Sequence, residues 1–189
     1  MKGLGILSLR WGSALVVGTA LVLPQVLSAQ GPAQGINVHG HWVIEVRNAD
    51  GTLRLRREFE NTLAEPGKRL LASLLAKENA FDYWQIQLGT DYLCNEAAGT
   101  PTFCSLEEPI GPHAFPYIFR NLTKTVTNST LVLHGTFVAA NNGSIGAVTT
   151  YTWIFSPSGA NAFTSALLQS PIPIQATQTV SVTVTFTFS

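Results

Sequence analysis

Two histidines in the stretch VHGHWV have the spacing of metal ligands. His39 and His41 are two positions apart, so on a strand both side chains point to one face, as when a strand supplies two ligands to zinc or copper. A site needs a third ligand, and nothing in the sequence brings His113 or His134 close. We therefore interpret the pair as polar residues opposite a buried tryptophan, predict no metal, and keep metal binding as the alternative.

The sequence gives no indication of a catalytic site. It has no GxSxG nucleophile motif, no phosphate-binding loop and no dinucleotide fingerprint. Glu107 and Glu108 are its only adjacent acidic pair, and neighbouring loop residues seldom converge on one bond, whereas glycosidase carboxylates lie about 5–10 Å apart across it. We therefore expect a non-catalytic protein without a cofactor.

The two cysteines of the chain, Cys94 and Cys104, enclose the stretch NEAAGTPTF. A single pair in an exported chain predicts a disulfide, because export places cysteines in an oxidising compartment. A loop this short contributes on the order of 2–3 kcal/mol in the chain-entropy model. A metal pair or two free thiols are the alternatives, and the absence of a CxxC spacing disfavours them.

Aromatic residues gather around this cystine loop and the proline-rich segment that follows it. Flat rings on loops at one end of a sandwich can stack on sugars, so these residues form a candidate ligand loop. The alternative is that the rings fill the end of the fold. The candidate residues are Tyr92, Phe103, Phe115 and Tyr117.

The start of the chain has the pattern of a secretory signal peptide. Lys2 and Arg10 form a short basic start, the apolar run WGSALVVGTALVL follows, and small residues provide a cleavage site. An uncleaved membrane anchor is disfavoured because the run is short and Pro24 interrupts it. We predict a signal peptide at residues 1–29, one domain at residues 30–189, and a secreted or cell-surface protein with no membrane span after cleavage.

Charge is distributed unevenly along the chain. It has 11 Lys and Arg and 11 Asp and Glu, and because Lys2 and Arg10 belong to the predicted signal, the remainder carries a net charge near −2. That is too weak to indicate nucleic acid as a partner. The last 65 residues, from Thr125 on, contain no Asp, Glu, Lys or Arg. Their solvent face must therefore be hydroxyl and amide, or be covered.

Short alternating stretches separated by turn residues predict a mainly β protein, an antiparallel β-sandwich of about eight strands. One amphipathic helix, with a leucine stripe and a proline in its first turn, is expected to pack on it. Asp50-Gly51 and Asn142-Gly143 are hairpin signals. The predicted strands are 38–47, 53–60, 82–90, 118–127, 129–139, 145–156, 162–168 and 177–189, and the helix is 65–80.

The final stretch, TQTVSVTVTFTFS, alternates without a break and has no charge on either face. One interpretation makes it a central strand with a solvated threonine face. The other places it at a sheet edge, or places its threonine face against another copy; natural edges usually carry Lys or Pro, and no Lys follows Lys124. We favour self-association by strand addition. The predicted residues are Val180, Val182, Thr183, Val184, Thr185, Phe186 and Phe188.

Both ends of the chain carry a resemblance. The hairpin HGHWVIEVRNADGTLRLRREFENTL with its leucine-rich helix, together with the ending SPIPIQATQTVSVTVTFTFS, resembles uncharacterised exported all-β proteins of environmental bacteria. The ending alone is similar to the last strands of some phage tail-fibre domains. The resemblance implies an exported particle or appendage component and brings no catalytic residues.

These features together predict a non-catalytic exported structural protein. We expect a subunit that self-associates into an extracellular filament, appendage or surface layer, with other copies of itself as its partners. The alternative is a monomeric secreted module for carbohydrate binding or adhesion, which would bind glycan through the aromatic loops.

Overall fold

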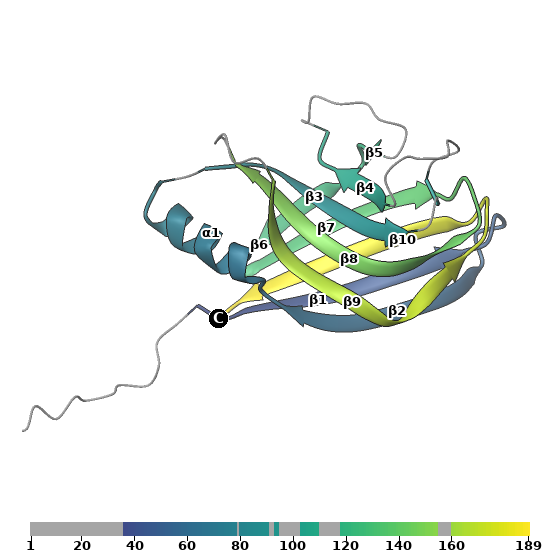
Figure 1. The fold of residues 1–189 in the computed structure, drawn as a ribbon, viewed down its shortest axis with the longest axis horizontal. Coiled ribbons are helices and arrows are strands. Elements are labelled where there is room, and N and C mark those ends of the chain that lie inside the picture. Colours follow the sequence, from purple (N-terminus) through teal and green to yellow (C-terminus); the bar gives the residue numbers. More distant parts are fainter. Residues whose placement is uncertain (1–35, 79, 91–92, 95–102, 110–117, 155–159) are drawn as a thin grey trace, which may run out of the picture. The chain divides into compact units, whose positions relative to one another are not determined.

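Ten strands and one helix make up the part of the chain that the computed structural model describes, namely residues 36–78, 80–90, 93–94, 103–109, 118–154 and 160–189 (Figure 1). The predicted signal peptide, residues 1–29, lies outside the described residues. The start of the domain at residue 30 therefore stays a prediction. No helix in these described ranges is long and apolar enough to cross a membrane.

The strands form two five-stranded sheets, as expected for a β-sandwich with one helix. Sheet A has the order β2 (Leu53–Thr62), β1 (Val38–Arg47), β10 (Thr179–Phe188), β7 (Thr130–Val138) and β6 (Thr123–Thr127). Sheet B has the order β5 (Ile118–Phe119), β4 (Phe103–Glu107), β3 (Phe81–Thr90), β8 (Gly143–Ile154) and β9 (Ala160–Ile174). Every pair is antiparallel except β4 with β5. The predicted fold class is confirmed, with ten strands in place of about eight.

The additional strands come from short or proline-containing segments. β4 follows the cystine loop, where the sequence has too few alternating residues to indicate a strand. The predicted strand 118–127 is divided into β5 in one sheet and β6 in the other. β9 continues through Pro171 and Pro173, which the pattern had placed in a connection. An edge strand tolerates proline because its missing N–H can face away from the neighbouring strand.

β10 is the central strand of sheet A, and this overturns its predicted role as an edge (Figure 1). It pairs along its length with β1 on one side and β7 on the other; Val184, for example, lies opposite both Trp42 and Leu133. Both sides of its backbone are already paired, so a second copy cannot add a strand there. The idea that its threonine face meets another copy stays a prediction.

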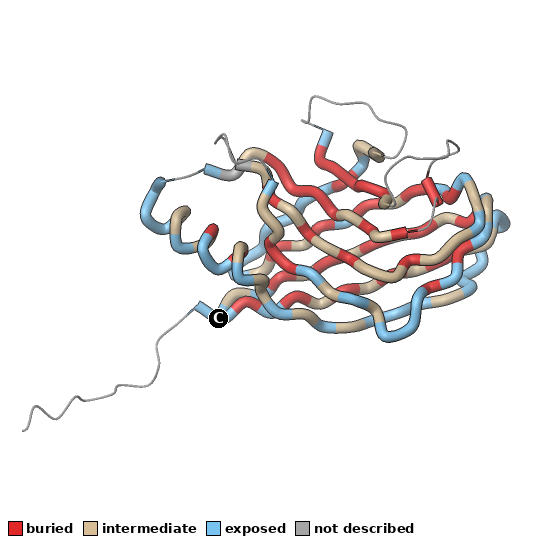
Figure 2. The backbone as a smooth tube through the Cα atoms, in the orientation of Figure 1, coloured by how far each residue is buried: buried red, intermediate tan, exposed pale blue. Residues whose placement is uncertain are grey.

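The core lies between the sheets and follows the alternation in the sequence (Figure 2). On β10 the inward residues Val180, Val182, Val184 and Phe186 are fully buried, and Phe188 at the end is half-buried. Rings from both sheets meet at one point of this core: Trp84 packs edge-on against Phe163, with centroids 5.1 Å apart, and Phe163 packs edge-on against Phe186 at 5.2 Å. Such contacts add to the free energy gained by burying apolar area.

Of the two predicted hairpin turns, the structure confirms one and contradicts the other. Asp50-Gly51 does turn β1 into β2: Gly51 has φ +84° and donates its N–H to the carbonyl of Asn48 at 2.9 Å. Asn142-Gly143 does not form a hairpin, because the strands on either side of it, β7 and β8, belong to different sheets. Asparagine and glycine favour a turn, but the pairing of the flanking strands depends on what they bury.

Helix α1 (Glu65–Leu75) begins at the predicted residue, with Pro66 in its first turn, and ends earlier than predicted. Lys77 adopts φ +58° just beyond its end, which stops the helical hydrogen-bond ladder. Leu70 is buried and Leu71 and Leu74 are half-buried, as the leucine stripe predicts. Leu75, which the stripe pattern also predicts to face the sheet, is instead 69% exposed, because the helix ends there.

Two seams remain where the edge strands of the two sheets face each other. At one, beside the two-residue edge strand β5, Leu122 donates its N–H to the carbonyl of Glu107 at the end of β4 at 3.0 Å. The ammonium of Lys124 on β6 lies 2.9 Å from the carboxylate of the buried Glu108. At the other, between β2 and β9, Leu63 bridges to Thr164. Helix α1 contacts β9 at this same end, so the β2–β9 seam is closed over only part of its length.

We predict that Gly67→Ala destabilises the protein by about 1–3 kcal/mol, because the added methyl group would collide with the backbone carbonyl of Phe163 on β9. Elsewhere in a helix this substitution normally stabilises by roughly 0.5–1 kcal/mol. Denaturant unfolding would measure the change. Ala72→Gly on the exposed side of α1 is the matched control, expected to cost about 0.5–1 kcal/mol through propensity alone. A stabilised Gly67→Ala variant would contradict close docking of the helix.

Candidate association site

A groove of about 430 Å³ occupies the open part of the β2–β9 seam. Beyond the Leu63–Thr164 bridge the two edge strands separate, and residues 57–60 of β2 face residues 166–170 of β9 with Ile172. The half-buried Phe59 and Leu168 and the buried Ile172 give it an apolar floor. We call this feature the seam groove.

Strand β9 bulges beside the seam groove. Ala147 of β8 pairs with Leu167, but Ile145 pairs with Ile172, so residues 168–171 have only Gly146 opposite them. A bulge of this kind bends the strand and disrupts the ladder. Leu167, where the bulge begins, is 86% exposed, the highest value among the large hydrophobic residues of the described chain.

A second hollow, of about 370 Å³, lies on the other side of Leu167. Small residues make it: Gly89, Gly146 and Ala147 lie in it, and Pro171 of the bulge closes one side. Leu167 is therefore an apolar knob that lines two hollows at once. None of these residues was among those predicted from the sequence; the only signal was a proline pair directly after an alternating stretch.

Each edge strand of the two described sheets has a feature that discourages a further strand from pairing with it. The bulge and two prolines interrupt β9, while β2 carries charged residues including Arg57, Glu58 and Glu60. On the other side, β6 holds Lys124 and β5 has only two residues. The absence of lysine after Lys124 therefore does not indicate an unguarded edge. Contacts between copies would have to be made by side chains.

The outer face of β10 is a row of hydroxyl side chains. Ser181, Thr183 and Thr185 are half-exposed, and the Thr183 hydroxyl lies 3.0 Å from Nδ1 of His134 on β7. A shallow hollow of about 270 Å³ lies over this row and also touches Glu45 and Arg56. The predicted solvated threonine face is thus present on a central strand.

Charged residues on β1 and β2 form a ladder beside these hydroxyls. Glu45 lies 3.0 Å from the guanidinium of Arg47 and 2.7 Å from that of Arg56, which also lies 2.6 Å from Glu58. Hydrogen bonding to Arg47, with further contributions from Arg56, lowers the pKa of the Glu45 carboxyl. The Glu58 carboxyl likewise has a lowered pKa, chiefly through Arg56. Such surface pairs contribute little to stability.

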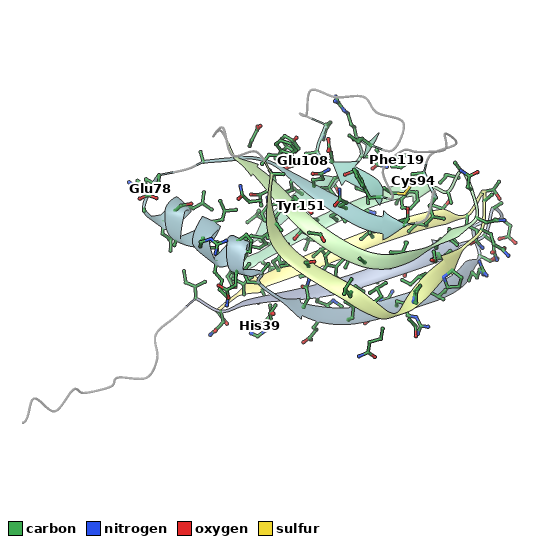
Figure 3. All side chains as sticks on the ribbon, viewed as in Figure 1. His39, Glu78, Cys94, Glu108, Phe119 and Tyr151 are labelled. Atoms are coloured by element: carbon green, nitrogen blue, oxygen red, sulfur yellow. A yellow bond between two sulfur atoms is a disulfide. The ribbon has the colours of Figure 1, made fainter. Side chains whose placement is uncertain are left out.

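The two histidines of the possible metal site lie on the outer face of sheet A. His39 is exposed (Figure 3), and Nε2 of His41 lies 3.5 Å from Glu58. Among the described residues, no three His, Cys, Asp or Glu side chains are grouped so as to hold a metal ion. His113 lies outside the described residues.

Three residues of the candidate ligand loop, Tyr92, Phe115 and Tyr117, lie outside the described residues. Phe103 is the half-buried first residue of β4. Sugar binding at this loop therefore stays a prediction. A described aromatic pair lies elsewhere on sheet B: Tyr83 stacks on Trp153 at 5.4 Å, and burial, with the negative charges of Glu107 and Asp82, raises the Tyr83 pKa to about 12.

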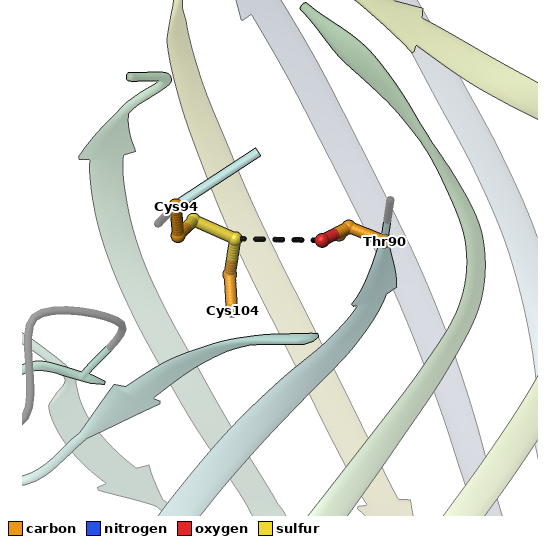
Figure 4. The surroundings of a disulfide bond; sticks show 3 residues. All are labelled: Thr90, Cys94 and Cys104. Carbon is orange, nitrogen blue, oxygen red and sulfur yellow. Dashed lines mark hydrogen bonds between the residues drawn. A yellow bond between two sulfur atoms is a disulfide. The ribbon is translucent and has the colours of Figure 1, made fainter. Parts of the chain in front are cut away.

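The predicted disulfide between Cys94 and Cys104 is present, with the Cα atoms 5.6 Å apart (Figure 4). Cys104 is fully buried and Cys94 nearly so. The hydroxyl of Thr90, at the end of β3, lies 3.9 Å from the Cys104 sulfur. The bond ties residue 94 to the start of β4.

Comparison of this chain with models of protein families, with curated proteins and with solved structures finds no match.

We predict that the side-chain carboxyl of Glu45 titrates below its ordinary pKa and that Arg47→Gln moves it back up. Because the folded pKa is lowered, the contribution of this carboxylate to stability is present above its unfolded pKa and is lost as pH falls through the folded value. It amounts to at most about 1 kcal/mol for a surface pair. Carboxyl-carbon NMR titration of the two proteins would measure both pKa values, with Arg54→Gln as control. Identical titration curves would contradict the role of Arg47.

We also predict that replacing both cysteines, Cys94→Ser with Cys104→Ser, lowers the free energy of unfolding by about 2–3 kcal/mol, because the reduced unfolded chain regains the entropy of the closed loop. Urea unfolding of the double variant against the oxidised wild type would measure it. Wild type unfolded under reducing conditions should lose a similar amount. An unchanged midpoint in both tests would show that the disulfide does not constrain the unfolded chain.

Proposed function

We propose that this chain is a non-catalytic exported structural protein that self-associates as a subunit of an extracellular filament, appendage or surface layer. The observation that carries the proposal is Leu167, an 86% exposed leucine between two hollows on an uncharged strand. Leu53 and Leu75 are also exposed, at 49% and 69%, but Leu167 is the most exposed of the large hydrophobic residues in the described chain and lines two hollows, which together form an apolar surface suited to a partner.

The distribution of charge supports the same proposal. The 65 uncharged residues from Thr125 on supply most of β6 and all of β7, β8, β9 and β10, which include interior strands of both sheets. Their outward side chains are mostly hydroxyl and apolar groups, with His134 on β7, and none is Asp, Glu, Lys or Arg, so no fixed charge repels an identical surface on a second copy. Charge is instead concentrated on the β1–β2 hairpin, on α1 and at the seam held by Lys124.

Export is supported by the predicted signal peptide and by the disulfide, which is typical of oxidising compartments. A secreted or cell-surface location is the environment in which a subunit of an extracellular assembly would act.

We expect the protein from residue 30 onward to associate as its concentration rises, and Leu167→Lys to shift the dissociation constant upward by roughly tenfold or more, because a leucine burial of about 1.5–3 kcal/mol is lost. Light scattering coupled to size-exclusion chromatography, over a range of concentrations, would measure this shift.

Val126→Lys is the matched control: Val126 is 68% exposed on β6, away from the seam groove, and its substitution should leave association unchanged. Thr185→Lys reports separately on the hydroxyl face of sheet A. A strict monomer at high concentration would refute self-association altogether.

A further inference from the structure

We propose, on the basis of the self-association just proposed, that two copies meet through a reciprocal contact in which Leu167 of each copy enters the seam groove of the other. The occupant of the groove is thus a second copy of this chain. The contact defines a twofold dimer as the building unit of the assembly.

Reciprocity follows from the position of the knob. Leu167 stands on the rim of the seam groove, so knob and groove belong to one continuous patch. A patch that contains both a protrusion and its own complement pairs with an identical patch across a twofold axis, which satisfies both contacts in both copies. A foreign partner that filled the groove would have to provide a separate surface to cover Leu167.

The walls of the groove disfavour an added strand as the occupant. An extended peptide between β2 and β9 would need regular backbone groups on both sides, but residues 168–171 bulge and Pro171 has no N–H to donate. On the opposite wall, Arg57 carries one positive charge and Glu58 and Glu60 carry two negative charges, and Glu58 is already paired with Arg56. The wall therefore offers little net charge to an ionic ligand. A side chain from an uncharged surface suits these walls better.

The apolar floor of the seam groove is suited to binding a leucine side chain. Phe59, Leu168 and Ile172 provide apolar contacts, and Phe59 is held by stacking on the fully buried Trp42 at 5.8 Å between ring centroids. A volume of about 430 Å³ leaves room for one large aliphatic side chain and part of the neighbouring backbone. An apolar anchor in such a pocket, surrounded by polar residues, has the arrangement of a binding hot spot.

Because a reciprocal contact closes on itself, it stops at the dimer. Growth into a filament or layer would need a second surface. The hydroxyl row of β10 lies on the outer face of sheet A, separated from β2 by β1, and lines no part of the seam groove, so it can serve as that surface while the groove is occupied. The two contacts can therefore be tested independently.

A cross-linking experiment between differently tagged copies tests the proposal. Arg57→Cys is placed at the mouth of the groove in one tagged protein, and Leu167→Cys in another. The two are mixed at a concentration at which light scattering shows association and treated with a short bismaleimide, which leaves the native disulfide intact. We expect a covalent heterodimer that carries both tags. Val126→Cys in place of Leu167→Cys is the matched control and should give none, and near-ultraviolet circular dichroism verifies that each variant is folded.

The outcomes separate the two proposals. Heterodimer formation with the Leu167 variant and not with the Val126 variant supports the groove contact. Association by light scattering without such a heterodimer, together with no effect of Leu167→Lys, overturns the groove contact and leaves self-association standing. A wild-type monomer at every concentration overturns both.

Discussion

The structure depends on how the two sheets are joined along their edges. Two five-stranded sheets bury one face of each strand between them, but at both sides of the sandwich a pair of edge strands from opposite sheets remains, and the apolar interior would be open to water unless something spans the gap. One seam is spanned by the Leu122–Glu107 hydrogen bond and by Lys124 with the buried Glu108. The other is spanned at one end only, by helix α1 and the Leu63–Thr164 bridge.

This requirement accounts for much of the uneven charge distribution. Glu108 is buried, and a buried carboxylate needs a partner; Lys124 and the N–H of Trp84 at 2.8 Å provide it. Most of the other charges lie on the exposed hairpin β1–β2 and on or near α1, while Asp82, Glu107 and Arg120 lie on or beside β3, β4 and β5. The interior strands β7, β8 and β10 carry no Asp, Glu, Lys or Arg, and each presents one largely apolar face to the core.

The sequence correctly predicted those elements for which the local conformational preference of the residues and the packing of the whole fold favour the same structure. The alternation of β10, the Asp50-Gly51 turn and the proline at the start of α1 each have one low-energy arrangement, and the structure has it. The position of β10 in its sheet was not predictable, because alternation specifies which side chains are buried and says nothing about which strands lie on either side. The prediction of a hairpin turn at Asn142-Gly143 was wrong: neither residue has a positive φ, and Gly143 is already the first residue of β8. The pairing of the flanking strands depends on contacts distant in sequence. Lys77 ended α1 although the helical pattern continued, since one residue with positive φ is sufficient to stop the ladder.

The sequence pattern could not predict the seam groove either, because the groove depends on how β9 departs from regular pairing. Pro171 and Pro173 looked like the end of a strand, whereas in the structure they protect the edge of one. The same bulge that protects the backbone of β9 from pairing leaves residues 168–171 without a full set of opposite neighbours, and Leu167 is exposed where the bulge begins. The bulge in β9 therefore has two results: it prevents a further strand from pairing with the backbone of β9, and it leaves Leu167 exposed. Such a distortion excludes open-ended addition of strands while it permits a contact defined by side chains, and a contact of that kind is limited by the shape of the groove that receives it.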